Sequence, residues 1–342
     1  MATSYADAHS SPQGPGDARP TALQIILDNN LVGKLTDQTI LVTGGTDGLG
    51  LEPVRQLAKT GAHVFFTARN ATKAEKIIHD ILEEAKVDEM LKGTKVEWVE
   101  VDNASLESVK KGAEDFLRRS DQLNVLVCNA GISQTPHAVT KDGYEKQFAV
   151  NHLAHFLLFN LLRPLLLRSS TPSLNSRVVC VSSVAHGFST VQLGNYNLDK
   201  PPQEQYDPMC ELEGDYNPMI LYGQSKTANI WFANEIDRRY GGKGLHGLSI
   251  HPGTIVTAGW KIFKSVEQGA ATQVLAAVGK DYEGKDGMYL DDCGVGQPIP
   301  DDVQIGISGY RPWAYNPDGE RRLWKDSLDM VGVKDDQETC QA

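Results

Sequence analysis

The order of two kinds of segment constrains the fold of this chain more than any other feature. From residue 39 onward, short apolar runs rich in β-branched residues alternate with longer amphipathic stretches. The expected strands cover residues 39–43, 63–67, 96–101, 124–128, 177–182 and 245–250, and the expected helices cover 49–60, 72–91, 105–119, 142–168 and 219–240. Strands joined through helices cross over in the right-handed sense and form a parallel sheet covered on both faces. The alternation predicts an α/β fold with a single doubly wound parallel sheet of about seven strands.

Other parts of the chain depart from this alternation. Residues 1–20 are rich in Ser, Pro, Gly and Asp, a composition that predicts a disordered N-terminal tail. Residues 187–218 are rich in Asn, Tyr, Pro and Gly, which predicts a long insertion near a binding site. The rest of the chain, 21–342, is expected to form one domain, and its C-terminal segment at about 291–342 is expected to be irregular before a last helix near 319–330.

Composition and charge exclude several classes of protein. The formal net charge is −11 in 342 residues and no cluster of Lys and Arg forms a basic face, so a nucleic-acid partner is not expected. The five cysteines are scattered and no C-x-x-C occurs, which predicts reduced thiols in a cytoplasmic protein without a metal site. The N-terminus lacks the pattern of a secretory signal, and the apolar stretch 157–167 is too short to span a bilayer, so no membrane anchor is expected.

A glycine-rich turn, TGGTDGLG (43–50), follows the first expected strand and precedes the first expected helix. Its glycines at 44, 48 and 50 have the spacing G-x-x-x-G-x-G. Glycines in such a turn let the backbone approach a pyrophosphate at the N-terminus of a helix. An ordinary glycine turn is the alternative, but the flanking strand and helix favour a dinucleotide site. The predicted cofactor-binding residues of this turn are Gly44, Thr46, Asp47, Gly48, Leu49 and Gly50.

The end of the second expected strand favours NADP over NAD. An acidic side chain there would hold the ribose 2′-hydroxyl of NAD, but no acid occurs between Phe65 and Lys73. Arg69 stands where a 2′-phosphate would lie, and Lys73 is one helical turn further on. A guanidinium suits a phosphate dianion. The alternative is that both are solvated surface cations.

Tyr222 and Lys226 are four residues apart near the start of an expected helix. This spacing puts both side chains on one helix face. A phenol with a reference pKa of about 10 exchanges protons poorly near neutrality unless a neighbouring cation favours its phenolate. The pair predicts an acid/base centre for reduction of a carbonyl, in which Lys226 lowers the pKa of Tyr222.

A second Tyr-x-x-x-Lys pair, Tyr196 and Lys200, is the alternative centre. Pro201 and Pro202 follow it directly. Proline lacks an amide donor and clashes with the preceding turn, so these residues stop any helix there. Tyr222 begins a stretch without proline and is therefore preferred.

Several motifs occur in a fixed order. TGGTDGLG is followed by VDNAS (101–105), NAG (129–131), VNHLAHFLL (150–158), VVCVSSVAH (178–186), YGQSK (222–226) and HPGTIVT (251–257). Over roughly residues 36–330, this order resembles the short-chain dehydrogenase/reductase family, especially its branch of retinol-dehydrogenase-like and WW-domain-oxidoreductase-like enzymes. The resemblance implies a Rossmann-type domain, a nicotinamide cofactor and hydride transfer to or from a carbon that bears oxygen.

The resemblance also implies roles for single residues. Tyr222 would be the acid/base, Lys226 would lower its pKa and bind ribose, Ser183 would hold the substrate oxygen, and Asn151 would orient a water in the proton relay. Asn151 as a helix-packing amide is the alternative. The implied cofactor-binding residues outside the glycine turn are Asp102, Asn103, Asn129, Ala130, Gly131, Tyr222, Lys226, Pro252, Gly253, Ile255 and Thr257. Asn129 could equally tie two strands together.

Two details of the serine motif stay open. Ser182 precedes Ser183, and either could hold the substrate oxygen, although the resemblance favours Ser183. The family commonly places its serine about thirteen residues before its tyrosine, which fits Tyr196 by spacing. Preferring Tyr222 therefore implies that 187–218 is an insertion at the substrate mouth.

The leading hypothesis is an NADP(H)-dependent oxidoreductase that interconverts a hydrophobic ketone or aldehyde and its alcohol. The substrate pocket is expected to be built by 187–218, the stretch after Thr257, and the aromatic residues Trp313 and Tyr315. A non-catalytic NADP-binding regulatory or scaffold protein of the same fold is the alternative, and an enzyme that uses NAD is a third hypothesis.

Two expectations concern histidines and assembly. The histidines in the motifs, His152, His155 and His186, lack a carboxylate or thiol at ligand spacing and are expected to pack rather than bind metal. The resemblance also implies a homodimer through the helices 142–168 and 222–240.

Overall fold

The sheet of the computed structural model confirms the predicted α/β architecture. The structure describes residues 5–210, 217–255, 262–285, 287–300 and 308–335. Within these residues one sheet has the strand order β3-β2-β1-β4-β5-β6-β7-β8, and every neighbouring pair is parallel except β7 with β8. The strands are β1 (Thr39–Val42), β2 (His63–Ala68), β3 (Lys95–Glu100), β4 (Val125–Cys128), β5 (Ser176–Val181), β6 (Leu245–His251), β7 (Tyr289–Asp291) and β8 (Gly294–Val295).

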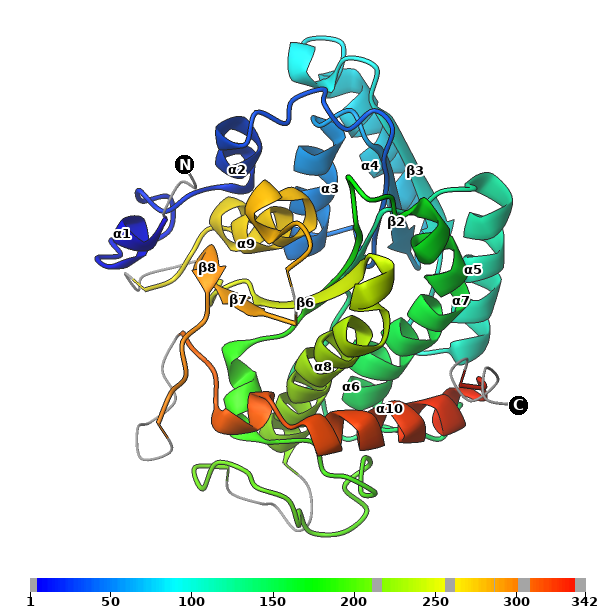
Figure 1. The fold of residues 1–342 in the computed structure, drawn as a ribbon, viewed down its shortest axis with the longest axis vertical. Coiled ribbons are helices and arrows are strands. Elements are labelled where there is room, and N and C mark those ends of the chain that lie inside the picture. The colour runs from blue at the N-terminus through cyan, green and yellow to red at the C-terminus, as the bar shows by residue number, and fades with distance from the viewer. Residues whose placement is uncertain (1–4, 211–216, 256–261, 286, 301–307, 336–342) are drawn as a thin grey trace.

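Helices cover both faces of this sheet (Figure 1). One face carries α2 (Ala22–Asp28), α3 (Gly48–Ala58), α4 (Ala71–Glu84) and α9 (Val266–Val278), whose apolar residues share one buried cluster. The other carries α5 (Leu106–Arg119), α7 (Ala154–Ser169), α8 (Pro218–Tyr240) and α10 (Pro317–Val331). The central strands β1, β4, β5 and β6 are buried at every position, as expected for parallel strands between two helical layers.

The last third of the chain departs most from expectation. Sequence reasoning missed α9, which begins with a capping box between Ser265 and Gln268 and is buried from Gln268 to Val278. It also missed β7 and β8, which are joined by a turn with positive φ at Asp292 and Cys293. Both strands are too short to show a periodic apolar pattern. The described part of 187–218 is irregular, as predicted, apart from the end of a 3-10 turn (Val184–Phe188) and the first residue of α8.

The prediction of a disordered tail over residues 1–20 is wrong for residues 5–20. A short helix α1 (Ala6–His9) begins this segment, and the side chain of Arg19 is buried, with 4% of the residue exposed. The composition is typical of disorder, but buried polar contacts to a distant part of the chain hold the segment on the domain. Such contacts leave no trace in local composition.

A long apolar helical stretch runs through α6 (Lys146–Phe148), a π-helical turn (Ala149–Leu153) and α7. By length and composition alone this stretch, Lys146–Ser169, could cross a membrane. It is longer than the apolar run recognised in the sequence. Core helices of soluble proteins pass the same test, and 78% of the most apolar window is buried inside the domain. Packing therefore accounts for its apolar character.

The C-terminal helix α10 covers the helices expected to form a homodimer. The ring of Trp324 on α10 lies 5.0 Å from that of Phe156 on α7 and 6.1 Å from that of Phe232 on α8. Along α8, only Arg238 is exposed to solvent. Helix α8 therefore offers little exposed surface, and a homodimer through these helices stays a prediction.

Candidate active site

A cavity of about 1000 Å³ lies at the carboxyl ends of β1, β2, β4, β5 and β6, where open α/β sheets gather their ligands. The sequence-predicted residues that line it are Gly44, Thr46, Asp47, Leu49, Gly50, Arg69, Asp102, Asn103, Asn129, Ala130, Gly131, Ser183, Tyr222, Lys226, Pro252, Gly253 and Ile255. Gly48, Lys73 and Asn151 are not part of this lining. Thr257 falls outside the residues that the structure describes.

The glycine turn leads directly into the N-terminus of α3. Gly44 and Gly48 have φ of +68° and +43°, conformations that side chains other than glycine rarely adopt. Asp47 caps the helix by accepting from the Gly48 amide at 2.9 Å. The N-terminal amides of α3 thus lie at the cavity wall, where they suit an anion such as a pyrophosphate.

Gly50→Ala is expected to destabilise the protein and weaken dinucleotide binding. A Cβ at this position would lie 2.2 Å from the Gly44 carbonyl oxygen and 2.6 Å from Asn129 Nδ2. These atoms cannot yield without opening the turn, and overpacking of this kind costs about 1–3 kcal/mol. Thermal unfolding measures the loss. Gly242→Ala is the matched control, because no atom lies within 4 Å of its Cβ position, and equal losses in the two variants would contradict the prediction.

Two cations, Arg69 and Lys73, were predicted to hold a 2′-phosphate, and in the structure they have different surroundings. Arg69 lines the cavity, is exposed, and has no hydrogen bond or ion pair within the described part of the chain. Lys73 instead donates from Nζ to Asp47 Oδ2 at 2.8 Å. Of these two cations, the guanidinium of Arg69 is therefore the one available to a ligand in the cavity.

The predicted adenosine-side residues also brace the walls. Asn129 Nδ2 donates to the Thr43 carbonyl at 2.8 Å, and its Oδ1 accepts from Gln273 at 2.8 Å, so it ties β4 to β1 and to α9. Asp102 Oδ1 accepts from the Ala104 amide at 3.0 Å, and Asn103 Nδ2 donates to the Val150 carbonyl at 3.3 Å. The structural reading of Asn129 is thus confirmed, and its position in the lining is compatible with ligand binding as well.

Asn151 lies in the π-helical turn before α7, a kind of irregularity that recurs at functional sites. Its amide donates to the Ile132 carbonyl and to Ser225 Oγ, both at 2.9 Å, and its Oδ1 accepts from the Ile132 amide at 2.8 Å. A Cβ on Gly131 would lie 3.3 Å from Asn151 Oδ1 and 3.4 Å from Lys226 Nζ. Asn151 therefore sits behind Gly131 at the wall, close to the ammonium.

Tyr222 and Lys226 share one face of α8, as the i,i+4 spacing predicts. Lys226 Nζ lies 5.5 Å from the centroid of the Tyr222 ring and donates to the Val181 carbonyl at 3.1 Å. Burial lowers the pKa of Lys226 to about 8, so the side chain is charged at pH 7.

The Tyr222 hydroxyl faces two serines. Burial raises the pKa of Tyr222, while side-chain hydrogen bonds with Ser183 and Ser133 oppose that rise. Burial thus outweighs the predicted lowering of the Tyr222 pKa by Lys226, whose ammonium is hydrogen-bonded to a carbonyl of β5 rather than to the phenol, and the net shift is upward.

The two serines of the motif have different surroundings. Ser182 also borders the cavity, but it is buried and its Oγ donates to the Lys226 carbonyl at 2.8 Å, which ties β5 to α8. Ser183 lines the cavity beside Tyr222 and caps the following 3-10 turn by accepting from the Ala185 amide at 3.1 Å. The geometry favours Ser183 as the hydroxyl that meets a substrate.

The alternative tyrosine lies away from the cavity. Tyr196 donates to Asp326 Oδ2 at 2.5 Å and stacks on Phe148, and neither it nor Lys200 lines the cavity. The segment between them is not helical, and Leu198 within it has φ of +54°. The helix-stopping argument from the prolines is confirmed.

The motif histidines are held by hydrogen bonds. His152 Nε2 bonds with Ser327 Oγ at 2.9 Å, His155 Nε2 with Thr43 Oγ1 at 2.9 Å, and His186 Nδ1 with the Ser183 carbonyl at 2.6 Å. Burial lowers the pKa of all three. Among the described residues no group of His, Cys, Asp or Glu has the arrangement of a metal site.

Sequence reasoning missed several cavity residues and expected others that lie elsewhere. The missed residues follow the NAG motif or flank other motifs, and include Ser133, Gln134, Thr135, Lys146 and Thr254. Adjacency to NAG was the only signal for Ser133. No described residue of 187–218 lines the cavity. Trp313 donates to the His186 carbonyl and the Tyr315 hydroxyl accepts from the Tyr289 amide, so the predicted aromatic walls serve packing instead.

Comparison with known proteins gives a consistent result. A family model described as short chain dehydrogenase matches residues 38–200. The short-chain dehydrogenase/reductase prx1 of Penicillium roqueforti is 44% identical, over 97% of this chain and 96% of that protein. The WW domain-containing oxidoreductase of Homo sapiens is 36% identical, over 83% of this chain and 68% of that protein. The crystal structure of an uncharacterized protein from Mycobacterium paratuberculosis is similar, with a TM-score of 0.65 and 29% identity over 87% of this chain and 94% of that chain.

The similarity to prx1 runs along almost the full length of both chains. It agrees with the parallel sheet and with the order of motifs described above. The chain is an oxidoreductase that belongs to the short-chain dehydrogenase/reductase family, in the branch that includes the WW-domain-oxidoreductase-like enzymes.

Proposed function

We propose that this protein interconverts a ketone or aldehyde and the corresponding alcohol by hydride transfer with NADP(H), and that Tyr222 is the acid/base. One observation carries the proposal: a half-buried phenol, two serine hydroxyls and an ammonium line the same cavity as the glycine turn and Arg69. A small carbonyl compound would lie between these groups and the cofactor. Trp313 and Tyr315 do not line the cavity and are therefore not walls of the proposed substrate site.

The residues of the cavity fit a dinucleotide. The glycine turn would hold the pyrophosphate against α3, and Asp102 and Asn103 would face the adenine. Gly253 and Ile255 would meet the nicotinamide end. A bound nicotinamide cofactor supplies or accepts the hydride.

The protein supplies the proton and holds the oxygen. In the direction of reduction, Ser183 would donate a hydrogen bond to the carbonyl oxygen, and the Tyr222 hydroxyl would give that oxygen its proton. A raised pKa keeps the phenol protonated at pH 7, which suits a donor. Lys226 would stabilise the phenolate that remains, and Asn151 would keep Gly131 and Ile132 in place behind the reacting groups.

Arg69→Ala is expected to weaken NADPH binding about tenfold or more while NADH binding changes little. Hydrogen bonds to charged groups contribute about 1.5–3 kcal/mol, and only NADPH carries the 2′-phosphate. Titration of protein fluorescence with each cofactor measures the ratio. Lys73→Ala is the control and should have a smaller effect, because Asp47 already holds that ammonium. Equal losses for the two cofactors would contradict the assignment of Arg69.

The decisive test is turnover. Diverse ketones, aldehydes and alcohols are assayed with NADPH, NADH and their oxidised forms by the absorbance of the reduced nicotinamide. We expect reduction with NADPH as the better cofactor. Tight NADPH binding without turnover of any compound would favour the regulatory or scaffold alternative, and a preference for NADH would overturn the choice of cofactor.

A further inference from the structure

The segment that was expected to be disordered holds a buried arginine. Residues 5–21, hereafter the N-terminal arm, place Arg19 under the chain that follows the HPGTIVT motif. Its guanidinium donates to the Ile262 carbonyl at 2.9 Å, to the Phe263 carbonyl at 2.5 Å and to the Gly14 carbonyl at 3.1 Å. Its Nε pairs with Asp17 at 2.8 Å. A guanidinium with this many partners is a fixed anchor rather than a solvated charge.

The side chain of Gln268, in the first turn of α9, forms further hydrogen bonds with the backbone of the arm. Its Oε1 accepts from the Gly16 amide at 2.9 Å and from the Ser265 amide at 3.0 Å. Its Nε2 donates to the carbonyls of Asp17 and Arg19, both at 3.1 Å. The amide is 1% exposed, so these bonds are made without competition from water.

These contacts lead directly to the cofactor cavity. Lys264 follows the two anchored carbonyls, and its amide donates to the Thr254 carbonyl at 3.0 Å. Its side chain passes so close to Gly253 that a Cβ there would lie 2.6 Å from Lys264 Cδ. Gly253 and Thr254 both line the cavity, at the end proposed for the nicotinamide. Two hydrogen bonds and two residues, Phe263 and Lys264, thus connect Arg19 to that wall.

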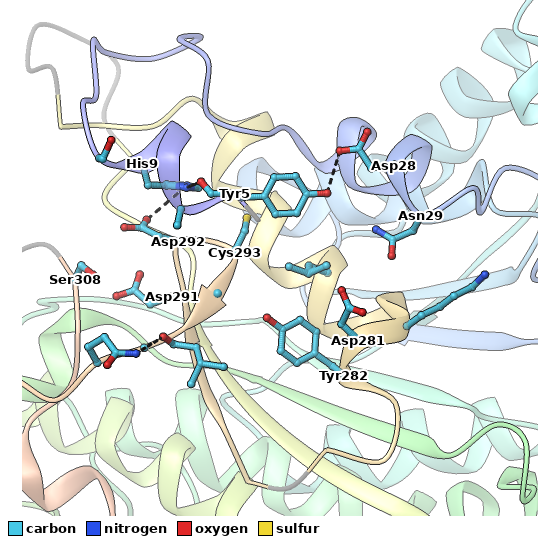
Figure 2. Close-up of a pocket in the computed structure, with 18 of the residues that line it drawn as sticks. Tyr5, His9, Asp28, Asn29, Asp281, Tyr282, Asp291, Asp292, Cys293 and Ser308 are labelled. Carbon is cyan, nitrogen blue, oxygen red and sulfur yellow. Dashed lines mark hydrogen bonds and ion pairs between the residues drawn. The ribbon is translucent and has the colours of Figure 1, made fainter. Parts of the chain in front are cut away.

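The tip of the arm is connected to Lys264 by a second route, through Asp292. A cavity of about 760 Å³ separates the arm from the β7–β8 turn, and Figure 2 shows Tyr5 bonded to Asp28 and His9 directed to Asp292 across it. The distances are 3.0 Å from the Tyr5 hydroxyl to Asp28 Oδ2 and 3.8 Å from His9 Nε2 to Asp292 Oδ1. The same Asp292 oxygen lies 2.7 Å from Lys264 Nζ.

We propose that the N-terminal arm positions the nicotinamide end of the cofactor site, with Arg19 as its positioning residue. This inference rests on the proposed function. Arg19 and Gln268 hold the backbone before Lys264 and the start of α9, and Lys264 in turn supports Gly253 and Thr254. Without the guanidinium, the Ile262 and Phe263 carbonyls lose the hydrogen bonds from Arg19, and the backbone that presents Lys264 is held less firmly.

The experiment compares a whole cofactor with half of one. NADPH and adenosine 2′,5′-bisphosphate, which lacks the nicotinamide half, are titrated into the full-length wild type, Arg19→Gln and Arg19→Lys. We expect Arg19→Gln to lower NADPH affinity by about five- to tenfold and to change affinity for the bisphosphate by less than about twofold. Arg19→Lys keeps the charge beside Asp17 and is expected to fall between wild type and Arg19→Gln.

The ratio of the two affinities separates positioning from a general loss of structure. Arg118→Gln, which removes an exposed pair with Asp115 on α5, is the control and should leave both affinities unchanged. Equal changes for both probes, or none, in Arg19→Gln would overturn the proposal, and if that variant does not fold, Arg19→Lys decides in the same way. If the proposed function is wrong, a different result is expected: the wild type itself would bind neither NADPH nor the bisphosphate. If the wild type prefers NADH to NADPH, the same comparison is made with NADH as the whole cofactor and 5′-AMP as the probe that lacks the nicotinamide half.

Discussion

Replacing Tyr222 with Phe is expected to lower kcat for carbonyl reduction by about 10²- to 10⁴-fold, the usual contribution of a positioned general acid. The substitution removes only the hydroxyl that faces Ser183 and Ser133, and the ring keeps its place on α8. NADPH affinity should therefore change little. Steady-state kinetics with an active ketone and a cofactor titration measure the two effects separately.

Tyr196→Phe is the matched control for this prediction. It removes the hydrogen bond to Asp326 on α10, which is expected to cost about 1 kcal/mol of stability. Turnover should stay near the wild-type value, because Tyr196 is outside the cavity. If Tyr196→Phe abolished turnover and Tyr222→Phe did not, the assignment of the catalytic centre would be wrong.

Lys226→Met is expected to inactivate the enzyme and stabilise the protein. The ammonium that would stabilise the phenolate is lost, so kcat should fall by about 10²-fold or more. Burial lowers the Lys226 pKa from 10.5 to about 8, a shift equivalent to about 3 kcal/mol of unfavourable free energy at pH 7. Loss of the hydrogen bond to the Val181 carbonyl offsets about 1 kcal/mol of that gain. Unfolding by urea at pH 7 should show the variant to be more stable by about 1–3 kcal/mol.

The pH dependence of this gain follows from the direction of the shift. The folded state binds the Lys226 proton less tightly than the unfolded state, so the cost of the buried ammonium is present in full below pH 8. As pH rises from about 8 to 10.5, the folded protein releases the proton first and the difference between wild type and variant shrinks. An advantage that is constant from pH 7 to 10 would show that desolvation of this ammonium is not its source.

Much of the site could be predicted because its signals are local. The spacing of Tyr222 and Lys226 within one helix, and the glycine turn between β1 and α3, depend on a few consecutive residues. The prolines after Lys200 excluded the competing pair for the same reason. Arg69 and Ser133 also follow strands closely, but nothing in the sequence showed that Asp47 would take Lys73 or that Ser133 would reach Tyr222.

The sequence by itself determined the parallel sheet, the placement of the cavity at its carboxyl edge, and the helix face that carries the phenol and the ammonium. Periodicity and turn chemistry encode these features within short stretches. Only the tertiary structure decided which serine faces the phenol and that α10 packs against α8. It also decided that Arg19 donates to the carbonyls of Ile262 and Phe263, which are more than 240 residues away in the chain. These contacts join segments far apart in the chain, so they exist only once the sheet has brought those segments together, and no local pattern records them.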